Sequence, residues 1–353
     1  MSYRHAVFVL QMLISDFDYE LPPELIAQQP LTERSASRMM VVDRQTGCVS
    51  DRSFVDLPEL LQPDDLLVMN DTRVFPARLI GKMETGGRVE IFLVREIGQH
   101  TWEALARPAK RLKPGKIVLF GDELTAEVVN KSEDGRVTIA FRSDGDLDEL
   151  IDRYGKTPLP PYIKREENSD PDRTRYQTIY AAKRGAIAAP TAGLHFTDAV
   201  LSQIAARGIQ TTRITLHVGY GTFEPVRVDD VSEHSVMPES YEIAEETATA
   251  LNDARDARRR IVAIGTTTTR ALESNVAEDC TFKAGSHTAG LTITPGYEFR
   301  AVGALLTNFH LPKSSLLILT STFGGHELIM KAYRHAVAEE YRFYSYGDCM
   351  LIV

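Results

Sequence analysis

The sequence predicts an α/β fold in which a larger α/β domain carries an inserted, small antiparallel β-barrel. Short β-rich runs separated by turns occupy residues 66–142, whereas helical and strand patterns alternate after about residue 147. The proline-rich segment Pro158–Pro161 blocks helix formation and marks the return from the insertion. We therefore expect an α/β domain formed by residues 1–69 and 156–353, with 1–11 as a flexible extension, and a barrel formed by residues 70–155.

The expected strands of the first half are apolar or β-branched runs bounded by turn residues. Asp134-Gly135 favours a hairpin turn because both residues tolerate positive φ. The predicted strands are Leu66–Met69, Arg88–Val94, Lys116–Phe120, Leu124–Asn130 and Arg136–Phe141.

In the second half, Thr197 can cap a helix that Gly208 ends. Ile261–Ile264 is a short apolar run before Gly265 and predicts a buried strand. The other expected helices are Ala244–Arg259, a helix starting at Ala271 and His326–Tyr341, and the other expected strands are Arg213–Val218 and Ser315–Thr320.

Composition restricts the class of protein. The three cysteines show neither disulfide nor metal spacing, and the histidines lie too far apart in sequence for a metal site, so we expect no metal and a reduced, cytoplasmic protein. No apolar run reaches membrane length, and Met12 is an alternative start to Met1. The net charge of −9 argues against a general nucleic-acid binder. It still allows local basic segments at 107–116 and 255–260, which could bind nucleic acid or could simply be solvated loop or helix surface.

Polar residues follow three expected strands. Asn70–Arg73 comes after the first of them, where a ligand could bind or where the chain could simply turn. Gly265–Arg270 joins a strand to a helix and suits an anion, although threonine capping alone would explain it. Thr307–Ser315 is a third polar segment between apolar runs.

Three other segments could belong to a site. The small-residue loop Gly185–Phe196 allows close approach of a ligand to the backbone and carries Thr191 and His195. His217–Phe223 contains Gly-x-Gly but lacks the third glycine of a dinucleotide fingerprint. The aromatic residues of Tyr341–Asp348 either stack on bases or belong to the core.

Together these segments resemble the S-adenosylmethionine:tRNA ribosyltransferase-isomerase family of queuosine biosynthesis, from about Asp16 to the end of the chain. The segments that carry the resemblance are Phe17–Pro22, Arg34–Arg38, Asn70–Arg73 with Pro76–Leu79, Pro158–Ile163, Arg175–Thr178, Ala189–Phe196, His217–Gly219, Thr307–Pro312 and Tyr341–Phe343. The sequence departs from the family at Met237, where a histidine is usual, while Glu239 is kept.

The resemblance implies that S-adenosylmethionine is a co-substrate and that no prosthetic group is bound. Its ribosyl group would be transferred to the aminomethyl-deazaguanine base at the tRNA wobble position and isomerised, giving epoxyqueuosine, adenine and methionine. The family fold is likewise an α/β domain with an inserted β-barrel. We expect a monomer that acts on tRNA without a membrane partner.

This chemistry requires a base for a ribose proton beside the sulfonium, an anion site for the methionine carboxylate and a basic surface for tRNA. The expected catalytic residues are His195 or His217 as the base, because histidine titrates near neutrality, and Asp71 as the rival base. Arg270 with its threonine turn suits the carboxylate, and Asn308 and His310 suit adenine or the modified base. The expected substrate-binding residues are Asn70, Arg73, Thr191, Glu239, Thr267, Arg270, Asn308 and His310, and the expected tRNA-binding residues are Lys110, Arg111, Lys113 and Arg342.

Two alternatives remain. An S-adenosylmethionine-dependent RNA methyltransferase would release S-adenosylhomocysteine, but the glycine-rich turn of most such enzymes is absent. A non-catalytic RNA-binding module would explain neither the net charge of −9 nor the small-residue loop around His195.

Overall fold

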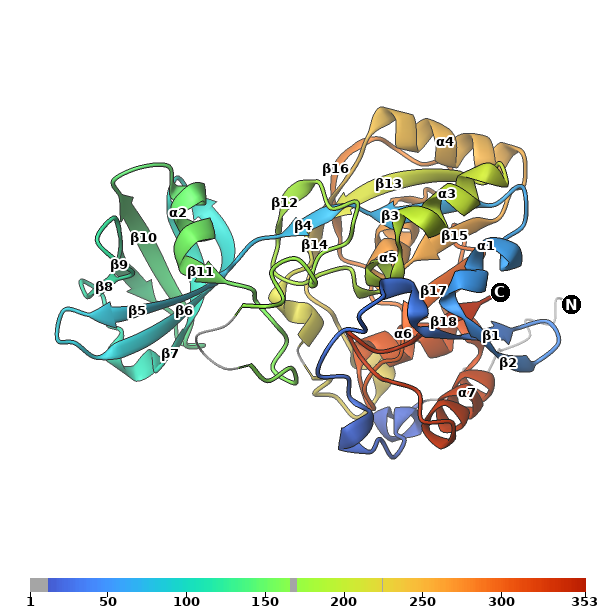
Figure 1. Cartoon of the computed structure of the whole chain (residues 1–353), viewed down its shortest axis with the longest axis horizontal. Helices are drawn as coiled ribbons and strands as arrows, with labels where there is room; N and C mark the ends of the chain where they lie inside the picture. Colours follow the sequence, from blue (N-terminus) through green and yellow to red (C-terminus); the bar gives the residue numbers. More distant parts are fainter. Residues whose placement is uncertain (1–11, 166–169, 224) are drawn as a thin grey trace, which may run out of the picture. The chain divides into compact units, whose positions relative to one another are not determined.

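The computed structural model describes residues 12–165, 170–223 and 225–353 (Figure 1). The chain divides into two compact units. The first, here the sheet unit, comprises the residues up to Asp71, Pro190–Leu216 and Gly221–Val353, and the second, the barrel unit, comprises Thr72–Ala189 and His217–Tyr220. The extension expected at residues 1–11 lies outside the described residues, and the domain boundaries expected from sequence stay predictions.

The sheet unit is built on a nine-stranded mixed sheet. Its order is β16 (Gly285–Ala289), β14 (Glu239–Ile243), β13 (Gln210–Leu216), β3 (Leu66–Asn70), β15 (Ile261–Ile264), β17 (Ala304–Asn308), β18 (Cys349–Ile352), β1 (Arg38–Asp43) and β2 (Cys48–Ser53). The four strands from β13 to β17 in this order are parallel to one another. Strands β3, β15 and β17 are buried along their whole length, which explains why β15 is apolar throughout and why β3 and β17 are apolar up to their polar carboxyl ends.

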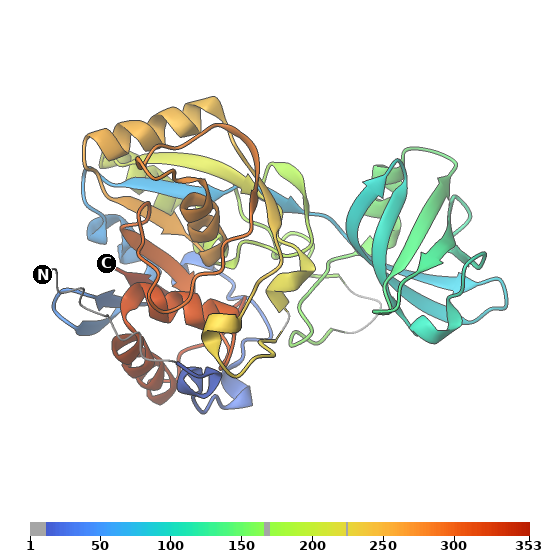
Figure 2. The same ribbon diagram turned by 180° about the vertical axis from the view of Figure 1, so that it is seen from behind.

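Helices cover both faces of this sheet. Helices α1 (Leu57–Leu60) and α3 (Asp198–Ala206) lie on the face turned to the viewer in Figure 1, and α5 (Thr266–Asn275) and α6 (Ser315–Gly324) lie on the face seen in Figure 2. The remaining helices of this unit are α4 (Glu245–Asp256) and α7 (His326–Ala338), with 3₁₀ helices η1 (Ile14–Phe17), η2 (Pro23–Leu25), η3 (Arg34–Ala36), η4 (Phe54–Asp56), η6 (Thr191–His195) and η8 (Val231–Glu233). The predicted cap is confirmed, because the Thr197 side chain accepts a hydrogen bond from the Val200 N–H at the start of α3.

Two sequence predictions about this unit are wrong. Ser315–Thr320 is not a strand but the first part of α6. The side chain of Ser314 caps this helix by accepting a hydrogen bond from the Leu317 N–H over 3.3 Å. A short apolar run fits a buried helix as well as a buried strand, so the apolar pattern alone did not distinguish them. The second error concerns α5, which begins at Thr266 and not after Arg270, so the threonines form its first turn.

The barrel unit contains a closed antiparallel barrel of six strands. Around the barrel these are β5 (Arg78–Met83), β6 (Arg88–Gly98), β7 (Thr101–Arg107), β10 (Val137–Ser143), β9 (Leu124–Lys131) and β8 (Ile117–Leu119), and β8 pairs again with β5. Gly81 permits this closure, because a Cβ there would lie 2.7 Å from the Leu119 carbonyl oxygen. The expected hairpin is confirmed, with Gly135 at φ 88° between β9 and β10.

The rest of the barrel unit adds few elements. Helix α2 (Leu147–Tyr154) follows the barrel and β11 (Gly155–Lys156) pairs antiparallel with β5, while η5 (Ala109–Arg111) lies between β7 and β8. Strand β4 (Thr72–Val74) pairs in parallel with β12 (Lys183–Ala186). The predicted fold class, an α/β domain with a small antiparallel β-barrel, is confirmed. Within the described ranges, no helix has the length and apolar character needed to cross a membrane.

Candidate active site

The carboxyl ends of the four parallel strands bring polar residues to one edge of the sheet. Asn70 ends β3, Thr266 follows β15 after a single glycine, and Asn308 ends β17. Because neighbouring parallel strands end at the same side, these residues share that edge. Ligands of open α/β sheets bind at this edge, so we take it as the candidate site.

Asn308 has a buried acceptor without a hydrogen-bond partner among the described residues. The residue is 3% exposed. Its Nδ2 donates to Nε2 of His195 over 3.2 Å and to the carbonyl oxygen of Tyr344 over 3.1 Å. Its Oδ1 is buried and has no hydrogen-bond partner within the described residues. Since an unsatisfied buried acceptor costs free energy, Asn308 is suited to receive a donor from a ligand.

His195, at the end of η6, has both ring nitrogens occupied. Nδ1 lies 2.8 Å from Oγ of Ser37, and Nε2 accepts from Asn308. Burial, with smaller contributions from Arg34 and Arg342, lowers the pKa of His195 to about 3. The ring is therefore neutral near pH 7, and its contacts fix the orientation of the Asn308 amide. Thr191 begins the same 3₁₀ helix and is half-buried.

His217, the residue after β13, belongs to the barrel unit. Its Nδ1 lies 2.8 Å from Oγ1 of Thr72, and its ring lies against Gly185, where a Cβ would come within 2.6 Å of the ring. The side chain is half-buried, in contrast to His195. This arrangement holds the ring and leaves it more accessible to a reacting group.

Asp71 and Asn70 have different roles at the end of β3. Asn70 exchanges two hydrogen bonds with the Leu216 backbone, at 2.9 and 3.0 Å, and so ties the end of β13 to the end of β3. Oδ1 of Asp71 accepts from the Thr215 hydroxyl over 2.6 Å. Its Oδ2 has no hydrogen-bond partner in the part of the chain that the structure describes. Asp71 therefore keeps an oxygen that could take a proton, whereas Asn70 is fully engaged.

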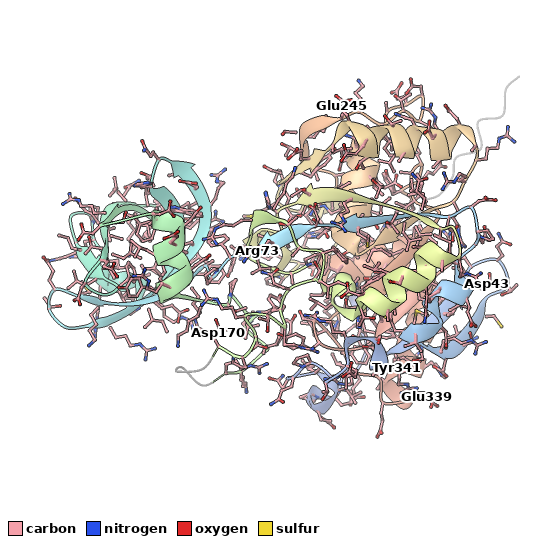
Figure 3. All side chains as sticks on the ribbon, turned by 45° about the horizontal axis from the view of Figure 1, so that its top comes forward. Asp43, Arg73, Asp170, Glu245, Glu339 and Tyr341 are labelled. Atoms are coloured by element: carbon pink, nitrogen blue, oxygen red, sulfur yellow. The ribbon has the colours of Figure 1, made fainter. Side chains whose placement is uncertain are left out.

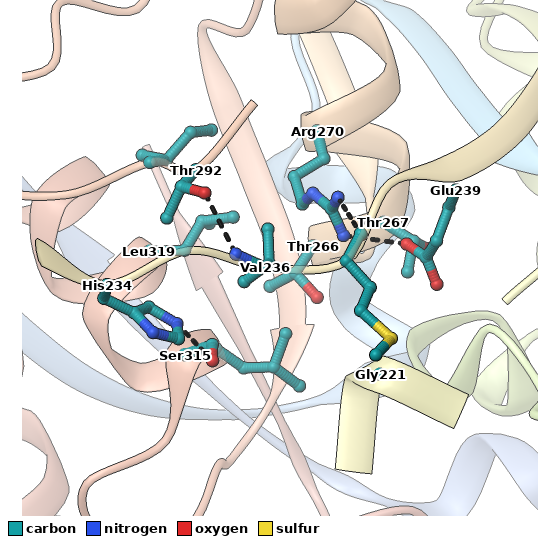
Figure 4. A pocket seen from close by; sticks show the side chains of 13 residues that line it. Gly221, His234, Val236, Glu239, Thr266, Thr267, Arg270, Thr292, Ser315 and Leu319 are labelled. Carbon is teal, nitrogen blue, oxygen red and sulfur yellow. Dashed lines mark hydrogen bonds and ion pairs between the residues drawn. The ribbon is translucent and has the colours of Figure 1, made fainter. Parts of the chain in front are cut away.

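Arg270 lies beside a small cavity at the amino termini of α5 and α6 (Figure 4). It donates to Oε2 of Glu239 over 2.8 Å and to the carbonyl oxygens of Met237, Ala289 and Leu291 over 3.1, 2.8 and 3.2 Å. Burial lowers the pKa of Arg270, and the Glu239 carboxylate opposes this effect. The carboxylate-binding role expected for Arg270 would require these contacts to rearrange.

The same cavity has a volume of only about 30 Å³ and is also lined by Thr267 and the half-buried His234. Nε2 of His234 lies 2.7 Å from Oγ of Ser315 (Figure 4). Burial lowers the pKa of His234. Met237 lines the cavity and is 40% exposed. Ser315 belongs to the polar segment Thr307–Ser315 but is not among the expected site residues, because the sequence pattern also places it at the start of a strand, although the preceding Ser314 is a helix-capping signal.

The last expected residues of the sheet unit are mostly buried. Nε2 of His310 lies 2.8 Å from Oγ1 of Thr307, and burial lowers the pKa of His310 to about 3. Tyr341, labelled in Figure 3, and Phe343 are 0% exposed, so the core explanation of these aromatics is right and base stacking by them is excluded. Arg342 is partly buried, and its guanidinium donates to the carbonyl oxygen of Gln29.

The expected basic residues of the barrel unit lie at its surface. Lys110 and Arg111 belong to η5, and Lys113 follows it; all three side chains are exposed. Arg73, on β4, is exposed as well. These positions are accessible to a polyanion. Among the described residues, no cluster of three histidine, cysteine or acidic side chains could hold a metal ion.

Comparison with known proteins gives full-length matches. The family model described as "Queuosine biosynthesis protein" matches residues 14–352. A protein of Symbiobacterium thermophilum is 51% identical and one of Syntrophotalea carbinolica 49% identical, each over 97% of this chain and 100% of its own length. Both are named S-adenosylmethionine:tRNA ribosyltransferase-isomerase. The crystal structure of S-adenosylmethionine tRNA ribosyltransferase from Thermotoga maritima is similar with a TM-score of 0.55 and 36% identity, over 96% of this chain and 100% of that one.

Proposed function

Since the chain belongs to the S-adenosylmethionine:tRNA ribosyltransferase-isomerase family, we propose that it performs the step of queuosine biosynthesis that this family carries out. It transfers the ribosyl moiety of S-adenosylmethionine to the aminomethyl-deazaguanine base at the tRNA wobble position and isomerises it. The products are epoxyqueuosine in tRNA, adenine and methionine. The observation that carries this proposal is the full-length identity of about half to proteins of that name.

The first step requires loss of a proton from the ribose carbon next to the sulfonium, whose positive charge makes that proton more acidic. His217 and Asp71 are the two groups that we propose for the base. The half-buried His217 ring is held by Thr72, and Asp71 keeps one oxygen without a hydrogen bond among the described residues. His195 is a poorer base, because burial lowers its pKa to about 3 and both of its nitrogens are occupied.

We assign adenine or the modified base to Asn308, with His195 as its positioning residue. Adenine in the donor offers its amino group and the deazaguanine base offers an amino group and a ring N–H, and these donors match Oδ1 of Asn308, which has no hydrogen-bond partner among the described residues. His195 restrains the amide by accepting from its Nδ2. His310 is engaged with Thr307 and supports the same segment from within the core.

The methionine part of the donor suits the amino terminus of α5, where Thr267 and Arg270 lie beside Glu239. Helix N–H groups and the guanidinium favour a carboxylate, and the Glu239 carboxylate favours the ammonium group. The cavity of about 30 Å³ is too small for this group, so binding requires its opening. Asn70, Arg73 and Thr191 remain expected substrate contacts on the strength of the family resemblance.

One experiment distinguishes this function from the alternatives. The protein is incubated with S-adenosylmethionine and a tRNA that carries the aminomethyl-deazaguanine base, and the products are identified by mass spectrometry. Adenine and methionine in equal amounts support the proposal, with an unmodified tRNA as the control that should give neither. S-adenosylhomocysteine would instead identify a methyltransferase, and no turnover without a thermal shift by the donor would identify a plain RNA-binding module.

A further inference from the structure

A second cavity, of about 420 Å³, lies within the barrel unit. It is formed by β4 and the residues after it, the end of α2, β12 and the residues 157–158 and 173–177. Three arginines line it, Arg73, Arg173 and Arg184, and one carboxylate, that of Asp152. The cavity is therefore positively charged, although the whole chain has a net charge of −9.

Asp152 holds two of these arginines in place. Its backbone carbonyl accepts from Arg173, and its carboxylate accepts from NH1 of Arg184. Nε of Arg184 also lies 3.4 Å from Oδ1 of Asp148, and its guanidinium lies over the Phe75 ring at 5.0 Å. The Arg184 guanidinium is thus fixed by contacts on several sides, so its side chain loses less conformational entropy when a ligand binds.

The arginines nevertheless keep donors for a ligand. NH2 of Arg184 is buried and has no hydrogen-bond partner within the described residues. Arg73, labelled in Figure 3, is exposed and forms no ion pair or side-chain hydrogen bond with any described residue. Gln177 holds the backbone next to Arg73. Its Oε1 accepts from the Val74 N–H over 3.1 Å, and its Nε2 donates to the Val74 carbonyl oxygen over 2.6 Å.

We propose that this cavity binds phosphate groups of the tRNA backbone. The planar guanidinium fork matches two phosphate oxygens at once, and an oxyanion would satisfy the buried NH2 of Arg184. This inference rests on the proposed function, because it takes tRNA as the polyanion. It adds a contact region separate in sequence from the exposed residues Lys110, Arg111 and Lys113.

The test is tRNA binding by the full chain, measured by fluorescence anisotropy between 50 and 200 mM salt. Arg73→Gln/Arg173→Gln removes two charges and leaves the Arg184–Asp152 pair intact. We expect at least a tenfold weaker Kd at low salt and a slope of log K against log salt that is smaller by about 0.7 to 0.9 for each lost contact. Arg73→Lys/Arg173→Lys should recover most of the slope, because the charge is kept.

Arg142→Gln is the matched control, since this exposed arginine lies on β10 outside the cavity and pairs with Glu127. Arg173→Gln alone, at a residue with no proposed role in the donor site, should leave adenine release at saturating tRNA unchanged and raise only the KM for tRNA. An unchanged Kd and slope in a chain that still releases adenine would overturn the inference and leave the proposed function standing. The inference would also be overturned if millimolar inorganic phosphate bound to the protein and the variants weakened that binding but not the binding of tRNA. The cavity would then be a site for a small phosphate.

Discussion

The amide nitrogen of Asn308 donates to Nε2 of His195 across 3.2 Å, and the amide oxygen of the same side chain is buried without a described partner. Because Nε2 accepts, the ring proton resides on Nδ1, which donates to Oγ of Ser37 over 2.8 Å. The spare hydrogen-bonding capacity of this pair therefore lies on Asn308, and His195 serves to orient it.

Asn308→Ala should lower kcat/KM for S-adenosylmethionine about 10- to 100-fold, because a substrate donor loses its buried acceptor. Adenine release measured by mass spectrometry gives the rate, and the Tm separates lost recognition from lost folding. Asn130→Ala, on the exposed end of β9, is the control. A rate equal to that of the control would remove Asn308 from substrate binding.

His217→Gln should reduce adenine release at least about a hundredfold if His217 is the base. Gly185→Ala should produce part of this loss, since its new Cβ would lie 2.6 Å from the His217 ring and displace it. Gly98→Ala is the matched control, because the nearest atom to its Cβ would be 3.7 Å away. Near-normal turnover of His217→Gln would transfer the role of base to Asp71, whose Asp71→Asn variant completes the test.

The arrangement of the sheet could be predicted from sequence where short-range pattern determines structure. The apolar run Ile261–Ile264 is a buried strand with the expected bounds, and the polar residues after β3, β15 and β17 lie at one edge because those strands are parallel. The pattern failed for Ser315–Thr320, because burial on all sides removes the periodicity that separates helix from strand.

Contacts between distant segments could not be predicted. Arg270 has the charge of a ligand-binding residue, but Glu239, 31 positions away, and three backbone carbonyls occupy its donors. Nothing local to Gly81 indicates that β5 meets β8 and closes the barrel. Such partners depend on tertiary packing, which a single sequence does not display.

The Arg270–Glu239 pair provides a stability prediction. Both side chains are at most 10% exposed, so Glu239→Ala leaves a buried guanidinium without its counter-charge and should reduce the free energy of unfolding by about 3 to 5 kcal/mol. Arg270→Met/Glu239→Leu should recover most of this loss, because it removes both charges. Asp18→Ala breaks the exposed Lys313 pair and should cost less than about 1 kcal/mol. Urea unfolding checks all three, and equal losses for Glu239→Ala and Asp18→Ala would contradict the prediction.

Two buried histidines should make stability depend on pH. Burial lowers the pKa of His195 and of His310 from 6.5 to about 3, so between these values the unfolded chain binds more protons than the folded one. The free energy of unfolding is therefore highest above pH 6.5 and falls as the pH is lowered towards 3, by up to about 1.4 kcal/mol per pH unit for each histidine.

His310→Gln should remove one of these two contributions, so its urea-unfolding free energy should change less between pH 6.5 and 5 than that of the unsubstituted chain. This range lies above the ordinary pKa of carboxylates, which limits their contribution. His100→Gln, at an exposed turn between β6 and β7, controls for the loss of an imidazole. If His310→Gln kept the full pH dependence, His310 would be protonated in the folded chain over this range, and the neutral hydrogen bond that we describe with Thr307 would be wrong.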